Sequence, residues 1–268
     1  LPDEWIETSI LNDYNWLSFK DSIKNIHLTN KTSIHKYEKF RQRLAYDEIL
    51  SSFLIFNQIK KTSRKVKRFK IINNIHSNQL LQNLDFELTS DQLSSISDIR
   101  NDFKKKRLYR LIQGDVGSGK TIVALLSIID VIKSGFQGVI MAPTELLASQ
   151  HYNYFLNYLS HLDIKIALLT SKVKKKEEIY SKIQMHEIDL LIGTHAVYNS
   201  KLKFNNLGII VIDEQHKFGV QQRVNLLDKS SSCHTLVMSA TPIPRSLTFA
   251  IYGEIDVSNI KTKPKGRK

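Results

Sequence analysis

Gly114-Asp115-Val116-Gly117-Ser118-Gly119-Lys120-Thr121 fits the pattern G-x-x-x-x-G-K-S/T of a phosphate-binding loop. The glycines allow a tight turn whose backbone N–H groups can surround a polyphosphate. Lys120 brings a positive charge to the β- and γ-phosphates, and the Thr121 hydroxyl can coordinate Mg²⁺. Residues 122–132 follow with apolar side chains at helical spacing, so the loop opens a helix whose N-terminus faces the anion. We therefore expect a nucleoside triphosphate to bind at Gly114, Gly117, Ser118, Gly119, Lys120 and Thr121.

From residue 84 onward, short apolar runs alternate with helical patterns. Strands are expected at residues 109–113, 138–142, 165–169, 189–192, 209–213 and 235–238. Helices are expected between them, at residues 121–133, 145–159, 174–185 and 220–227. This alternation predicts an α/β fold with a mainly parallel sheet flanked by helices. Ligands of such sheets bind at the carboxyl ends of the strands, so we expect the functional residues along one edge.

Residues 1–83 differ from the rest, because they contain no glycine and show few strand-like runs. Apolar residues recur at helical spacing over residues 34–59. We expect residues 1–83 to form a helical arm or linker, and residues 84–268 to form the α/β domain. The basic run over residues 60–70 is explained equally well by contact with nucleic acid and by a helix end in solvent.

The composition favours a polyanionic partner, because 39 Lys and Arg residues face 26 Asp and Glu residues and give a net charge of +13. One cysteine excludes a disulfide within the chain and a metal site built from several thiolates. The sequence shows neither a signal peptide nor an apolar run long enough to span a membrane, and we expect a cytoplasmic protein. The chain begins at Leu1 rather than Met, and we expect it to be part of something longer.

A second motif follows the apolar run of residues 209–212, which leads into Asp213-Glu214-Gln215-His216. An acid at the end of a strand can hold Mg²⁺ through a water molecule opposite a phosphate loop, and Asp213 is suited to this role. Glu214 can then orient and deprotonate the attacking water. His216 has no second ligand beside it, so we interpret it as a hydrogen-bonding link rather than a metal ligand.

These two motifs and Ser239-Ala240-Thr241-Pro242 together resemble superfamily 2 helicases of the DExH type. The resemblance narrows to the RecG family of bacterial helicases, which act on branched DNA. It is carried by Phe86-Glu87-Leu88-Thr89 with Gln92, and by residues 141–148, 192–195, 218–223 and 240–245. Residues 43–50 are also similar to the helical segment that precedes the motor of that family. The resemblance is dense over residues 34–268.

The resemblance implies a first RecA-like motor domain that uses ATP and Mg²⁺. It assigns Lys120, Asp213 and Glu214 to catalysis, Thr121 and Asp213 to the metal, and Gln92 to the adenine edge with Phe86 beside it. His216, Ser239 and Thr241 would couple hydrolysis to DNA. The implied DNA contacts are Pro143, Thr144, Glu145, Thr194, His195, Phe218, Arg223 and Arg245.

The activity implied is that of an ATP-dependent DNA helicase or translocase, which remodels replication forks and recombination junctions in repair and recombination. We expect a monomer that depends on a second RecA-like domain and a wedge domain, both outside this chain. Because that second domain usually supplies an arginine finger, the chain alone should be nearly inactive as an ATP hydrolase. Two alternatives stay open: the related translocase that couples transcription to repair, and a nucleotide-binding interaction module without motor function.

Overall fold

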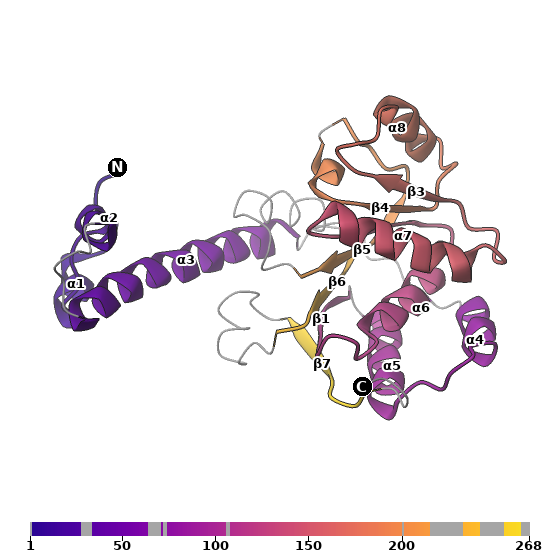
Figure 1. Cartoon of the computed structure of the whole chain (residues 1–268), viewed down its shortest axis with the longest axis horizontal. Helices are drawn as coiled ribbons and strands as arrows, with labels where there is room; N and C mark the ends of the chain where they lie inside the picture. Colours follow the sequence, from indigo (N-terminus) through magenta and orange to yellow (C-terminus); the bar gives the residue numbers. More distant parts are fainter. Residues whose placement is uncertain are drawn as a thin grey trace. The chain divides into compact units, whose positions relative to one another are not determined.

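The computed structural model describes residues 2–27, 34–63, 71, 74–105, 108–199, 201–214, 233–241 and 255–263 (Figure 1). The described residues divide into two compact units near residue 58. The helical arm was expected to extend to residue 83, and that boundary stays a prediction.

The first unit contains α1 (Thr8–Asp13), α2 (Phe19–His27) and the greater part of α3 (Ile34–Ser63). Neither glycine nor proline interrupts residues 34–63, so nothing in the sequence breaks the hydrogen-bond ladder of α3. The predicted helix over residues 34–59 is confirmed, and the structure continues it to Ser63.

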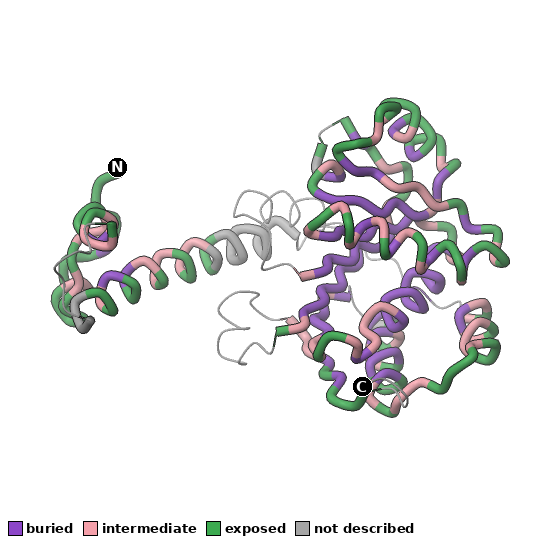
Figure 2. Tube along the Cα trace, in the orientation of Figure 1, coloured by how far each residue is buried: buried purple, intermediate pink, exposed green. Residues whose placement is uncertain are grey.

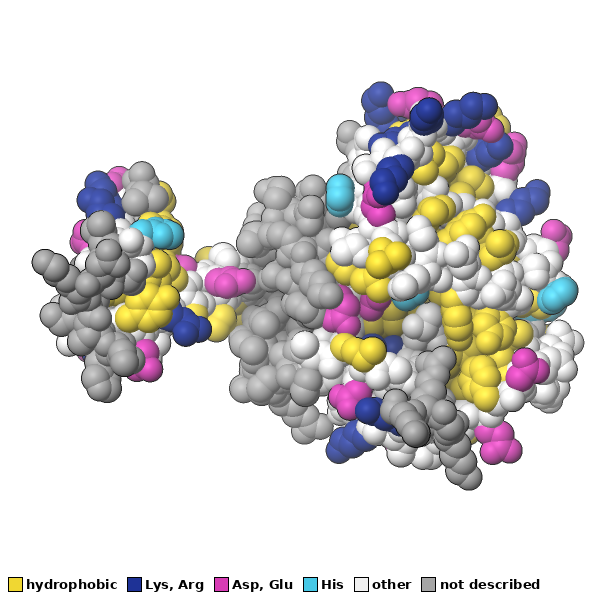
Figure 3. Space-filling view, viewed as in Figure 1, with side chains coloured by type: hydrophobic (Ala, Val, Ile, Leu, Met, Phe, Trp, Pro, Cys, Tyr) yellow, Lys and Arg dark blue, Asp and Glu magenta, His cyan; other side chains and the backbone are white. Residues whose placement is uncertain are grey.

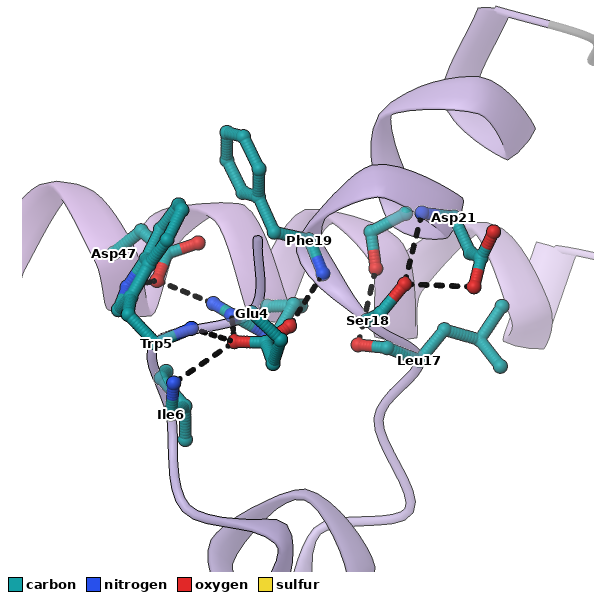
Figure 4. A network of polar contacts seen from close by, with 10 residues as sticks. Glu4, Trp5, Ile6, Leu17, Ser18, Phe19, Asp21 and Asp47 are labelled. Atoms are coloured by element: carbon teal, nitrogen blue, oxygen red, sulfur yellow. Dashed lines mark hydrogen bonds and ion pairs between the residues drawn. The ribbon is translucent and has the colours of Figure 1, made fainter. Parts of the chain in front are cut away.

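A buried cation holds the first unit together. The Arg43 side chain is 0% exposed, pairs with Asp47 four residues along α3, and donates to Glu4 Oε1 at 2.6 Å. Figure 4 shows that the Glu4 carboxylate also accepts from the N–H groups of Ile6 at 2.9 Å and Phe19 at 2.7 Å. Burial by itself raises the pKa of Glu4, but these N–H groups and Arg43 outweigh burial and lower that pKa.

The second unit contains a seven-stranded sheet in which every described pairing is parallel. Its strands are β1 (Tyr109–Gly114), β2 (Gln137–Met141), β3 (Ile166–Leu169), β4 (Leu190–Gly193), β5 (Leu207–Asp213), β6 (His234–Ser239) and β7 (Asp256–Ile260). The order across the sheet is β3-β4-β2-β5-β6-β1-β7. The six predicted strands are confirmed, and β7 was not predicted. Since β7 is an edge strand with several partly exposed residues, it lacks the apolar run that marks the others.

The helices of this unit are α4 (Ile75–Gln82), α5 (Ser90–Lys105), α6 (Lys120–Ile132), α7 (Glu145–Leu159) and α8 (Lys176–Gln184). A short 3₁₀ helix, η2, covers His195–Tyr198. The predicted helices that became α6, α7 and α8 are confirmed within two residues at each end. The helix predicted over residues 220–227 lies outside the described residues. Among the helices that the structure describes, none is both long and apolar enough to cross a membrane.

The core lies around α6, where every residue from Ile122 to Ile132 is buried (Figure 2). Helix α6 packs on β1, β2 and β5, and α4 and α5 pack against it. A polar contact ties these three helices together: Ser77 of α4 donates to Asp130 of α6, and Arg100 of α5 pairs with the same carboxylate at 3.0 Å. Burial raises the pKa of Asp130, and Ser77 and Arg100 oppose that rise. Helix α4, which was expected in the arm, therefore packs with the core of the second unit.

Candidate nucleotide-binding site

The predicted phosphate loop connects the end of β1 to the start of α6. Gly117 and Gly119 have φ values of +82° and +84°, in the left-handed region that side chains disfavour. A Cβ atom on Gly119 would lie 2.2 Å from the Gln92 amide nitrogen, and one on Gly114 would lie 2.6 Å from the Ile260 carbonyl oxygen. A side chain at Gly114 or Gly119 would therefore collide with Ile260 or Gln92, and glycine is favoured at both positions.

The Lys120 ammonium group donates to the carbonyl oxygens of Gly114 at 2.5 Å and Asp115 at 2.9 Å. Burial lowers the pKa of Lys120, while the charges of Glu214, Asp213 and Asp115 act in the opposite direction. The ammonium group is therefore hydrogen-bonded within the loop and lies within electrostatic reach of the acidic motif. Thr121 is half-buried in the first turn of α6.

Two observations test whether the loop fits a phosphate group. The Ser118 hydroxyl is buried and makes no hydrogen bond to another described group. No side chain that the structure describes caps the N-terminus of α6 at Gly119. A buried hydroxyl without a partner and an uncapped helix N-terminus are what an anion requires, so the residues present fit the expected triphosphate.

The acidic motif begins at the carboxyl end of β5. Asp213 is 9% exposed, and its Oδ2 lies 2.9 Å from Nε2 of His151 on α7. Glu214 accepts a hydrogen bond from the Ala240 backbone N–H at 2.9 Å. The part of the chain that the structure describes holds no group of three or more His, Cys, Asp or Glu residues that could bind a metal. A hydroxyl such as that of Thr121 and one carboxylate match the hard-oxygen donors that Mg²⁺ takes beside phosphates.

The Ser-Ala-Thr segment begins at the last residue of β6 and contacts the acidic motif and the residue that precedes the phosphate loop. The hydroxyls of Ser239 and Thr241 lie 3.1 Å apart. The Gln113 amide, at the end of β1, donates to the Thr241 carbonyl oxygen at 3.1 Å. Ala240 reaches Glu214, as described above. The predicted coupling residues Ser239 and Thr241 therefore lie beside the acidic motif, and His216 lies outside the described residues.

Gln92 contacts the phosphate loop. It is 1% exposed, its amide nitrogen donates to the Ser118 carbonyl oxygen at 2.8 Å, and its Oε1 accepts from the Thr89 N–H at 2.8 Å. Both ends of the amide are thus used within the chain, and its predicted contact with adenine stays a prediction. Phe86 is 41% exposed. It lines a cavity of about 550 Å³ between α4 and α5, together with Leu81, Gln82, Leu84, Asp85, Glu87, Leu88 and Leu93.

The predicted DNA contacts fall at two neighbouring strand ends. Pro143 and Thr144 follow β2, and the Thr144 hydroxyl caps α7 by accepting from the Leu147 N–H at 3.3 Å. Thr194 follows β4 and is buried, whereas the next residue, His195, is exposed at the start of η2. The other predicted contacts, Phe218, Arg223 and Arg245, lie outside the described residues.

Glu145 has an arrangement that the sequence did not indicate. Its carboxylate accepts from the backbone N–H of Ser171 at 3.0 Å and from the Ser171 hydroxyl, and it pairs with Lys172 at 3.3 Å. These contacts lower the pKa of Glu145, and the Ser171 hydroxyl contributes most. The carboxylate therefore holds the loop that follows β3.

Lys and Arg side chains gather over α8, interspersed with acidic ones (Figure 3). Several of these lysines form ion pairs: Lys172 with Glu145, Lys175 and Lys182 with Glu178, and Lys201 with Glu177. Lysine and glutamate side chains are thus paired with one another on this surface.

Two residues that the sequence analysis did not single out contact the site: His151 lies beside Asp213, and Gln113 lies beside Thr241. Gln113 directly precedes the phosphate loop, so proximity to a motif was the available signal. His151 carried none.

Comparison with known proteins places this geometry among helicases. The sequence model of the family described as DEAD/DEAH box helicase matches residues 89–249. Over 269 residues the chain is 43% identical to the ATP-dependent DNA helicase RecG of Thermotoga maritima, covering 99% of this chain and 34% of that protein. It is 41% identical to RecG of Borreliella burgdorferi, covering 96% of this chain and 38% of that protein.

A solved structure of RecG bound to a three-way DNA junction matches with a TM-score of 0.70 and 40% sequence identity, covering 100% of this chain and 36% of that one. The chain therefore spans about a third of the length of the relatives it matches. The predicted resemblance to RecG and the RecA-like fold are confirmed. Because the family model covers more than half of the 268 residues, the chain belongs to the DEAD/DEAH box helicase family.

Proposed function

We propose that this chain is the first motor domain of an ATP-dependent DNA helicase or translocase that acts on branched DNA in repair and recombination. The observation that carries the proposal is a phosphate loop whose Lys120 feels the charges of Glu214 and Asp213, in a chain about 40% identical to RecG over nearly its whole length. We place the protein in the cytoplasm of a bacterium, where such a substrate lies.

The phosphate loop binds the triphosphate of ATP in this proposal. Backbone N–H groups around Gly117 and Gly119 surround the phosphates, and the Ser118 hydroxyl finds its hydrogen-bond partner there. The Lys120 ammonium group exchanges the carbonyl oxygens of Gly114 and Asp115 for phosphate oxygens. Gln92 braces the loop at Ser118 and contacts the adenine edge.

Thr121 and Asp213 hold Mg²⁺, Asp213 through a water molecule. When bound, Mg²⁺ neutralises charge that develops on the transferred phosphoryl group. Glu214 orients the attacking water and accepts its proton. Since Ala240 N–H holds the Glu214 carboxylate, a shift of the segment that carries Ser239 and Thr241 changes the position of the base. Hydrolysis and DNA binding are coupled through this contact and through His216.

DNA binds at the edge of the sheet where Pro143, Thr144, Thr194 and His195 lie, with further contacts from Phe218, Arg223 and Arg245. Glu145 contributes by holding the loop at Ser171. A second RecA-like domain supplies the arginine finger, and a wedge domain supplies the junction contact. Without a finger, hydrolysis should fall by about 10³–10⁵-fold. We propose that the protein acts as a monomer.

The test compares ATP hydrolysis by the full-length protein without DNA, with linear duplex and with a three-way junction. We expect the junction to stimulate hydrolysis most, and Lys120→Ala to remove the stimulated rate. The isolated chain should bind a fluorescent nucleotide but release phosphate slowly. If DNA does not stimulate hydrolysis, the result favours a nucleotide-binding interaction module without motor function. If linear duplex and three-way junction stimulate hydrolysis equally, the result favours the translocase that couples transcription to repair.

A further inference from the structure

The imidazole of His151 joins α7 to the acidic motif of β5. His151 is 8% exposed and lies seven residues into α7, and its Nε2 atom is 2.9 Å from Asp213 Oδ2. The ring also has an apolar neighbour: the Phe155 ring meets it nearly edge-on, with centroids 6.4 Å apart and an interplanar angle of 83°. The imidazole is thus enclosed, with one polar contact directed at the residue proposed to hold the Mg²⁺-bound water.

We propose that His151 is a positioning residue that fixes the orientation of the Asp213 carboxylate. An ionised carboxylate only accepts hydrogen bonds, so Nε2 carries the hydrogen and donates it to Oδ2. A carboxylate held at one oxygen keeps its second oxygen in a constant direction. Hydrogen-bond partners of metal-binding groups act in this way, and losing one typically reduces metal affinity or activity by about 10–100-fold.

The position of His151 in α7 extends this role to the DNA-binding edge. Thr144 caps the N-terminus of α7, and His151 follows it by seven residues, which is two helical turns and about 10 Å along the axis. A helix of this length moves as a rigid body, so a displacement at Thr144 also displaces the imidazole relative to Asp213. Helix α7 therefore links the DNA-binding edge to the metal position. This inference rests on the proposed function, which assigns DNA to Thr144 and Mg²⁺ to Asp213.

The competing explanation is that His151 is a core residue whose hydrogen bond matters only for folding. The two explanations differ in their response to Mg²⁺. A fault in packing lowers stability and is not corrected by more metal. A misdirected carboxylate lowers the affinity for the metal, and saturating Mg²⁺ restores the lost activity.

Three variants of the full-length protein separate the explanations. His151→Phe keeps a planar ring and removes the donor. His151→Gln restores an amide N–H at a similar reach from the backbone. Asn153→Ala, at an exposed position of the same helix, is the control for changes in α7. The measurements are thermal unfolding, fluorescent ADP affinity with EDTA and across a Mg²⁺ titration, and ATP hydrolysis against Mg²⁺ concentration.

We expect His151→Phe to raise the half-saturating Mg²⁺ concentration about 10-fold or more, with ADP affinity in EDTA unchanged. His151→Gln should recover most of this loss, and kcat at saturating Mg²⁺ should return toward the wild-type value. Branched DNA should shift the half-saturating Mg²⁺ concentration of the wild-type protein, and His151→Phe should abolish that shift.

An unchanged Mg²⁺ titration in His151→Phe, or an equal loss of ADP affinity with and without Mg²⁺, would overturn the inference. If His151→Phe does not fold, His151→Asn against His151→Gln makes the same comparison, because the shorter amide cannot reach Asp213. The unmodified full-length protein tests the proposed function independently of the variants. If its ATP hydrolysis depends neither on Mg²⁺ nor on DNA, the proposed function is wrong, whatever the variants show.

Discussion

The Glu214 carboxylate accepts a hydrogen bond from the backbone N–H of Ala240 at 2.9 Å. The Glu214 N–H in turn donates to the Met238 carbonyl oxygen at 2.9 Å, and φ of Glu214 is +49°. Residues with side chains seldom adopt this left-handed conformation, and it persists where neighbouring contacts enforce it. Both the backbone and the side chain of the proposed general base are therefore hydrogen-bonded to residues 238–240, at the end of β6.

Glu214→Gln should abolish turnover and keep nucleotide binding. The amide oxygen can still accept from Ala240, so the local structure stays, but the group no longer takes a proton, and the loss should be about 10²–10⁴-fold. Asp213→Asn should also weaken Mg²⁺-dependent binding. Both variants of the full-length protein are compared by nucleotide titration with and without Mg²⁺ and by phosphate release. Equal binding defects in the two variants would show that these roles are assigned wrongly.

Gln92→Ala distinguishes bracing of the loop from reading of adenine. The change removes the hydrogen bond to the Ser118 carbonyl oxygen, so the loop should loosen and affinity for every ligand with phosphates should fall. The measurement is competition by ADP, GDP and pyrophosphate against a fluorescent nucleotide.

If the affinities for all three ligands fall equally, Gln92 acts only by bracing the loop. If the affinity for ADP falls more than that for GDP, Gln92 also contacts the adenine. Ser94→Ala is a suitable control, because Ser94 is exposed on α5, two residues after Gln92. Unchanged affinity for pyrophosphate in Gln92→Ala would contradict the bracing role.

Gly119→Ala should be more damaging than Gly135→Ala, although both glycines have similar positive φ values of +84° and +88°. The strain of a left-handed alanine, about 1–2 kcal/mol, is common to both. An added Cβ meets nothing within 4 Å at Gly135, but at Gly119 it lies 2.2 Å from the Gln92 amide nitrogen. Only Gly119→Ala should displace Gln92 and weaken nucleotide binding. Thermal unfolding and nucleotide titration check this, and equal effects would contradict it.

The positions of the strand ends in the site could be predicted from the sequence, because the end of an apolar run can be recognised from neighbouring residues alone. Apolar runs end at Gly114, Asp213 and Ser239, and parallel strands bring their carboxyl ends to one edge. The contacts between these ends could not be predicted in the same way. His151 and Asp213 are 62 residues apart, and Glu145 and Ser171 are 26 apart, so each pair depends on how the helices cross over the sheet.

Glu145 illustrates the limit of a motif. Its position at the start of the helix that follows β2 was predicted correctly, but the motif does not say where the carboxylate points. Gln92 is similar: its place before the loop was evident, while its bond to Ser118 required the fold. Strand β7 was missed because Asp256-Val257-Ser258-Asn259-Ile260 holds three polar residues and no apolar run, as an edge strand can.

Glu4→Gln should destabilise the first unit, because it removes the carboxylate that pairs with buried Arg43. The Glu4 side chain is 22% exposed, so solvent screens the pair, and we expect the free energy of unfolding to fall by about 1 kcal/mol. The pKa of Glu4 is lowered in the folded state. The Glu4 carboxylate therefore stabilises the first unit fully above about pH 4.3, the ordinary pKa of Glu. This stabilisation is lost as the pH falls through the lowered pKa of the folded state.

Both tryptophans of the chain, Trp5 and Trp16, lie in the first unit, so urea unfolding followed by tryptophan fluorescence reports on that unit. The difference between wild type and Glu4→Gln should be constant near neutral pH and shrink below about pH 4.3. Glu7→Gln makes the same charge change at an exposed position nearby and is the control. If the stability difference between wild type and Glu4→Gln grows as the pH falls, the pKa of Glu4 is raised by folding and not lowered.

The last prediction concerns the sign of the effect at Glu145. A carboxylate that faced DNA phosphates would repel them, so its removal would raise DNA affinity. The structure instead directs it at the Ser171 N–H and hydroxyl and at Lys172. Glu145→Ala should therefore release this loop and weaken binding of branched DNA by the full-length protein.

The measurement is branched-DNA affinity at several salt concentrations. Phosphate contacts release counterions, so the slope of affinity against salt counts them. Glu145→Ala should lower both the affinity and the slope, because Lys172 is no longer held near the edge. Glu187→Ala makes the same charge change at the opposite ends of the strands, shortly before β4, and should change neither. Tighter binding by Glu145→Ala would mean that this carboxylate faces the DNA directly and would remove its role in holding the loop.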